Sequence, residues 1–168
     1  LPLAFGVDLP EGRRLAVLLA GYLLTGFTEE LLWRGLALGA LERSRPLVAV
    51  LLSSALFGLS HLVNLLYRGS PALVLAQVWG AFCFGVGYAA IRRRTGSILW
   101  LMVLHAVADF AGAITAGPAL LFFIGQDAVL LGLGLILVLR ETAAVGHDRD
   151  PLINGPLQSS RTRSGISP

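Results

Sequence analysis

Seven ionisable side chains interrupt otherwise apolar stretches of this sequence, and they are of the types that perform acid–base chemistry. They are Glu29, Glu30, Arg34, His61, His105, Asp109 and Asp127. A charged side chain at the middle of a membrane helix costs about 2.5–3.5 kcal/mol. A chain that only had to cross a membrane would avoid this cost, so we expect a buried polar site shared by several helices.

The first group of these residues lies within one predicted helix. Glu30 and Arg34 are four residues apart, the spacing at which two side chains of a helix can pair. Glu29 then has no partner on its own helix. A carboxylate removed from water holds a proton more readily, which suits a general base acting on water. The alternative is that both acids share Arg34 in an architectural network.

The histidines open two interpretations. His105 and Asp109 again have the spacing of one helix face, which predicts an oriented acid–base pair or hydrogen-bond donor that needs no cofactor. Alternatively, both residues are metal ligands. Together with His61 and Glu29 they would form a set of nitrogen and oxygen ligands acceptable to zinc. The HExxH motif of soluble metalloproteases is absent, so zinc rests on composition alone. We expect Phe57, four residues before His61, to pack against the imidazole.

Asp127 is the one intramembrane charge without a role at this point. With its neighbour Gln126 it marks a helix break, a water-filled cavity or a hydrogen bond to a neighbouring helix. We do not place it in the chemistry.

The elements that must position these residues are membrane helices. Hydrophobic residues make up 55% of the 168 positions and charged residues only 14%, against roughly 25% in soluble domains. Apolar runs long enough to cross roughly 30 Å of hydrocarbon occupy residues 47–66, 72–91, 98–116 and 119–139, and a fifth run at 15–41 contains the glutamate pair. The sequence predicts an all-α polytopic transmembrane bundle of about five spans. This composition excludes a soluble catalytic domain and a nucleic-acid module.

The chain divides into three parts. Residues 1–13 are predicted to be an interfacial connector, residues 14–139 the transmembrane core with a long first helix over 14–42, and residues 140–168 a disordered polar tail. Because residue 1 is leucine and residues 1–13 do not resemble a signal peptide, we leave room for further spans upstream.

All thirteen basic residues are arginines, and most lie at the ends of the predicted spans. They therefore indicate topology and not a nucleic-acid partner. One side of the predicted bundle has Arg43, Arg45, Arg92, Arg93, Arg94 and Arg140, and the other has Arg13, Arg14 and Arg68. The excess places the C-terminus in the cytoplasm. The absence of lysine suggests G+C-rich codon usage and hence a bacterial cell membrane.

Read together, three segments resemble a known set of ordered motifs. Residues 29–34 (EELLWR), 57–61 (FGLSH) and 105–109 (HAVAD) look like EExxxR, FxxxH and HxxxN/D. These motifs are those of the CPBP family (CAAX proteases and bacteriocin-processing proteins), the Abi group of intramembrane proteases related to the type II CAAX prenyl endopeptidase. The resemblance covers roughly residues 15–116.

The resemblance implies a role for each motif residue. Glu29 and His61 would activate the attacking water, and His105 and position 109 would stabilise the oxyanion. Glu30 and Arg34 would hold the site together. The CAAX-type enzymes have Asn where this chain has Asp109, which disfavours a strict prenyl-protein substrate and favours the zinc alternative.

We therefore expect an intramembrane endopeptidase that cleaves membrane-associated proteins or peptides and has the lipid bilayer as its surroundings. A catalytically silent immunity or partner-binding protein of the same fold is the alternative. A proton-coupled transporter is a third, disfavoured by the glutamate–arginine pair and by the lack of a visible inverted repeat.

Overall fold

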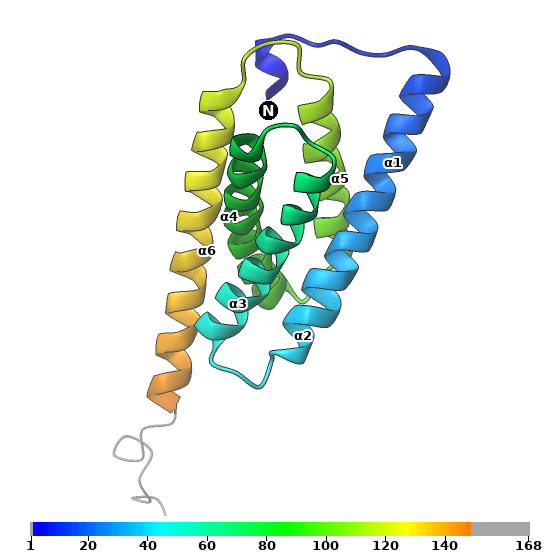
Figure 1. Cartoon of the computed structure of the whole chain (residues 1–168). Coiled ribbons are helices and arrows are strands. Elements are labelled where there is room, and N and C mark those ends of the chain that lie inside the picture. The colour runs from blue at the N-terminus through cyan, green and yellow to red at the C-terminus, as the bar shows by residue number, and fades with distance from the viewer. Residues whose placement is uncertain (1, 149–168) are drawn as a thin grey trace, which may run out of the picture.

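The computed structural model describes residues 2–148 and is helical throughout its core. A short 3-10 turn, η1 (Pro2–Phe5), precedes the first long helix. The connector that follows is tied to the segment that joins the last two crossings, because the Asp8 amide donates to the Ile114 carbonyl at 2.8 Å and the Ala116 amide donates to the Gly6 carbonyl at 3.1 Å. Residues 2–11 thus cross one end of the bundle (Figure 1).

The first crossing is one continuous helical segment in which the geometry changes at the glutamate pair. It consists of α1 (Gly12–Glu30), a π-helical segment η2 (Leu31–Ala37) and α2 (Leu38–Ala40). The predicted helix over 14–42 is confirmed to within two residues. Single π turns within α-helices often lie at functional sites. Here the π segment starts directly after Glu30 and contains Arg34.

The remaining helices begin and end where local chemistry dictates. Prolines at the first helical position start α3 (Pro46–Ser60) and α4 (Pro71–Thr95). A 3-10 segment, η3 (His61–Leu66), extends α3, and Gly96 ends α4 with a positive φ of 69°. Two further helices follow, α5 (Leu99–Ala113) and α6 (Leu120–Asp148).

Part of the predicted disordered tail is helical, which corrects the boundary at residue 140. Helix α6 continues to Asp148. Its extension is held by Glu141, whose carboxylate accepts two hydrogen bonds from Arg93 at the end of α4, one of them 3.1 Å from Nε. The sequence pattern missed this pair because its members are far apart in the chain. Residues 149–168 of the predicted tail lie outside the described residues.

The helices form two groups that meet along a seam. Helix α4 packs between α3 and α6, while α1 packs against α5 (Figure 1). Glycines make these contacts close: a Cβ at Gly26 would lie 2.6 Å from the Met102 carbonyl oxygen, and one at Gly134 would lie 2.6 Å from the Val86 carbonyl oxygen. Small residues allow membrane helices to approach in this way. The spacing of the helices within each group is therefore set by backbone contacts.

The bundle is a helical membrane architecture. In the described part of the chain, four helical segments are long and apolar enough to cross a membrane, namely those over residues 12–40, 46–66, 71–95 and 120–144. The predicted span over 98–116 contains only the fifteen-residue α5, which at 1.5 Å per residue is roughly 22 Å long. The all-α polytopic prediction is confirmed, with one crossing shorter than the bilayer's hydrocarbon core.

Candidate active site

A buried ion pair lies beneath the site. Arg34 Nη1 is 2.9 Å from Glu30 Oε1, and the two residues are 3% and 0% exposed. The N–H groups of the guanidinium are not aligned on the carboxylate as hydrogen bonds. Aromatic rings surround the rest of its charge, because the guanidinium carbon lies 4.5 Å from the centre of Phe57 and 5.6 Å from that of Tyr88. The predicted pairing of Glu30 with Arg34 is confirmed.

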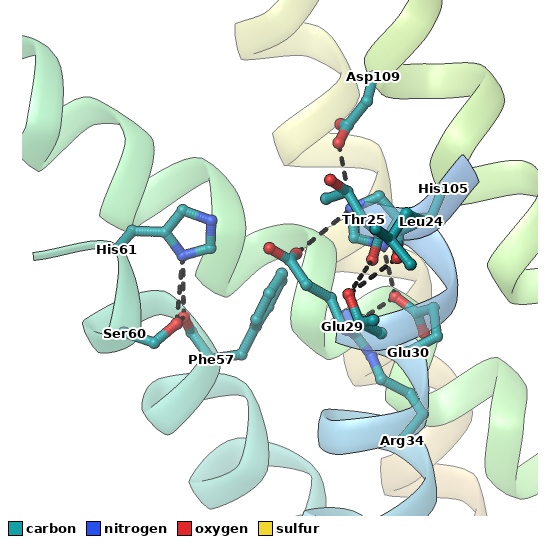
Figure 2. Close-up of polar contacts among 11 residues, drawn as sticks. Leu24, Thr25, Glu29, Glu30, Arg34, Phe57, Ser60, His61, His105 and Asp109 are labelled. Carbon is teal, nitrogen blue, oxygen red and sulfur yellow. Dashed lines mark hydrogen bonds and ion pairs between the residues drawn. The ribbon is translucent and has the colours of Figure 1, made fainter. Parts of the chain in front are cut away.

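His105 rests on this pair. Its Nδ1 lies 2.7 Å from Glu30 Oε1, so Nδ1–H donates to that carboxylate. Its Nε2 faces two other carboxylates, with Glu29 Oε2 at 3.7 Å and Asp109 Oδ2 at 3.6 Å. The sequence pattern pointed to Asp109 as the carboxylate behind the imidazole. In the structure Glu30 is the carboxylate behind the imidazole, at Nδ1. Asp109 instead lies near Nε2, together with Glu29 (Figure 2).

His61 stands where α3 changes into the 3-10 segment η3. Its Nδ1 lies 3.0 Å from the Phe57 carbonyl oxygen. Donation from Nδ1 to that carbonyl leaves Nε2 as the lone-pair nitrogen of the neutral ring. The Phe57 ring meets the His61 ring edge-on at 5.1 Å and also lies 6.3 Å from His105. Phe57 thus packs against the imidazole, as predicted, and also separates His61 from the buried Arg34.

The candidate catalytic residues line one cavity of about 480 Å³. Glu29 comes from α1, His61 from η3, and His105 and Asp109 from α5. Figure 2 shows the Glu29 carboxylate and the His61 ring on either side of the same gap. The cavity follows the seam between the α1–α5 pair and the α3–α4–α6 group, so neither group alone contains it.

Several further residues of the site were given no chemical role by the sequence. Phe84 of α4 lies 4.7 Å from the His105 ring and stacks on Tyr88 at 3.8 Å. Aromatic residues in an apolar helix are ordinary packing residues, so only their position makes them part of the site. The Asn64 side chain donates to Gln77 Oε1 at 2.9 Å across the α3–α4 turn. Asp127 also lines the cavity.

The donor set does not form a metal site in this arrangement. Within residues 2–148, no three His, Cys, Asp or Glu side chains are grouped so as to hold a metal ion. The four residues of the zinc alternative, Glu29, His61, His105 and Asp109, share the cavity, and the Nδ1 contacts of His105 with Glu30 and of His61 with a backbone carbonyl leave Nε2 of both rings available. These side chains would have to lie closer together than they do here to surround a tetrahedral zinc ion.

Comparison with known proteins agrees with the family resemblance of the three motifs. Residues 11–111, more than half of the 168-residue chain, match the family described as type II CAAX prenyl endopeptidase Rce1-like. The match spans α1 to α5 and includes all three motifs. No curated protein and no solved structure matches the chain. By the extent of this match, the chain belongs to the Rce1-like family of type II CAAX prenyl endopeptidases.

Proposed function

We propose that this protein is an intramembrane endopeptidase that hydrolyses peptide bonds of membrane-associated proteins or peptides with a water molecule activated by Glu29 and His61. The observation that carries the proposal is the convergence of Glu29, His61, His105 and Asp109 on one cavity above the buried Glu30–Arg34 pair. The family supports the protease class.

The first step is the attack of water. Glu29 takes a proton from the water while the water oxygen forms a bond to the scissile carbonyl carbon. His61, whose Nε2 is a free acceptor, orients the same water from the other side of the gap. Glu29 suits the role of base because it is not in the buried ion pair and is only partly exposed.

The second step is stabilisation of the oxyanion. In its imidazolium form His105 has one N–H for Glu30 and a second, at Nε2, that faces the cavity. That second N–H can donate to the oxygen that becomes negative in the tetrahedral intermediate. Asp109 holds the imidazolium from the Nε2 side. Collapse of the intermediate breaks the C–N bond, and the amine leaves with the proton that Glu29 accepted.

This scheme is tested by cleavage of membrane-peptide libraries by the purified protein in detergent. Replacement His105→Leu removes the oxyanion donor and is expected to lower kcat by about 10²–10³-fold. The assay contains a strong chelator throughout, because no step uses a metal. Activity that appears only with added zinc would contradict the scheme, as would full activity of His105→Leu. Peptide binding without cleavage by the wild type would favour the catalytically silent alternative.

We also propose that the cavity lies nearer the non-cytoplasmic face. The arginine-rich end of the bundle contains the α2–α3 and α4–α5 turns and the end of α6, which the positive-inside rule places in the cytoplasm. The cavity residues lie in the opposite half, towards the α3–α4 and α5–α6 turns.

Sidedness can be measured with single cysteines. In intact bacterial cells, a membrane-impermeant maleimide is expected to label Tyr67→Cys, in the exposed α3–α4 turn, and to spare Ser44→Cys, in the α2–α3 turn. The native Cys83 is fully buried and serves as an unreactive internal control. Labelling of Ser44→Cys alone would reverse the proposed orientation.

A further inference from the structure

Asp127 lies on the wall of the cavity opposite three of the four candidate catalytic residues. It belongs to α6, and Gln77, Gly80 and Ala81 of α4 line the same part of the cavity. Glu29, His105 and Asp109 come from the α1–α5 pair on the other side of the seam. A substrate segment between the two groups of helices would therefore meet Asp127 on one side and Glu29, His105 and Asp109 on the other.

The α4 surface is recessed where the Asp127 carboxylate meets it. A Cβ at Gly80 would lie 3.3 Å from Asp127 Oδ2 and 3.6 Å from Oδ1, tighter than ordinary contact for the nearer oxygen. The absence of a side chain at Gly80 therefore leaves room for the carboxylate at the cavity wall. Any larger residue there would have to displace it.

Within residues 2–148, no basic side chain forms an ion pair with the Asp127 carboxylate. No arginine lines the cavity, and Arg34 beneath it is paired with Glu30. A carboxylate within a membrane span is costly unless a partner or water compensates it. The partner that the cavity lacks is one that a bound substrate can supply.

We propose that Asp127 is a specificity-determining residue that accepts a lysine or arginine side chain of the substrate close to the scissile bond. The inference rests on the proposed proteolytic function and names its substrate class as peptides with a basic residue near the cleavage site. The same position disfavours an acidic residue of the substrate, because like charges repel.

The test compares three peptides that differ at one position near the cleavage site, which is Lys, Gln or Glu. Wild-type protein is expected to cleave the Lys peptide at least about tenfold faster, by kcat/KM, than the Glu peptide. Asp127→Asn is expected to abolish that ranking while leaving the rate for the Gln peptide within about threefold, since the amide keeps the shape and removes the charge. Glu42→Gln, which removes an exposed acid from the α2–α3 turn, serves as the control and keeps the ranking.

Peptide binding, followed by fluorescence, is measured on the same proteins so that the two proposals can fail separately. If the wild type binds the Lys peptide more tightly than the Glu peptide, and only when Asp127 is present, but cleaves neither, the specificity role stands and the proteolytic function fails. If cleavage occurs and the ranking survives Asp127→Asn, the specificity role is overturned. If Asp127→Asn folds normally but cleaves all three peptides more slowly by the same factor, the specificity role is overturned as well.

Discussion

Replacement of Glu29 by glutamine is expected to lower kcat by about 10²–10⁴-fold, the usual contribution of a general base. The amide has nearly the same shape as the carboxylate but cannot accept the proton of the attacking water. Glu29 is partly exposed to the cavity, and its carboxylate lies 3.7 Å from His105, which is longer than a hydrogen bond. The replacement therefore removes no close contact, and the protein should fold normally. Steady-state cleavage of the best library peptide by wild type and Glu29→Gln provides the measurement.

The matched control is Glu42→Gln, the same chemical change at an exposed acid outside the cavity. It should cleave at the wild-type rate. Peptide affinity should change little in Glu29→Gln, because the base acts in the transition state and not on the bound ground state. If Glu29→Gln retains activity within a few fold, another group must activate the water.

Replacement of Arg34 by methionine is expected to lower the free energy of unfolding by about 3–5 kcal/mol, because it leaves the fully buried Glu30 carboxylate without its cation. Methionine keeps much of the length and packs against the same aromatic rings. Thermal or denaturant unfolding in one detergent gives the difference. The exposed Arg43→Met, at the α2–α3 turn, should stay within about 0.5 kcal/mol of wild type.

The double variant Glu30→Gln with Arg34→Met separates charge from packing. Removing both charges should recover most of the lost stability, since a buried pair is often replaceable by neutral groups. Glu30→Gln also weakens the contact that orients His105, so activity should remain low although the protein is stable. A double variant as unstable as Arg34→Met alone would show that the pair does not act through its charge.

The helices were predictable because their signals are local. Apolar runs, prolines at the start of α3 and α4 and the arginines at the span ends predicted where most crossings begin and end to within a few residues. The Glu30–Arg34 and His105–Asp109 spacings likewise follow from the repeat of a single helix. The extension of α6 to Asp148 was not predictable, because it is held by Arg93 from another helix.

The sequence by itself determined that the chain is a membrane bundle and which few polar residues its spans contain, since composition and helical spacing need no knowledge of neighbouring helices. Only the tertiary structure decided that Glu30 stands behind His105, that Phe84 and Tyr88 complete the aromatic surroundings, and that Asp127 shares the cavity. These relations depend on how closely the two groups of helices approach. Close backbone contacts at residues such as Gly26 and Gly134 set the packing within each group, and no single-helix periodicity encodes it.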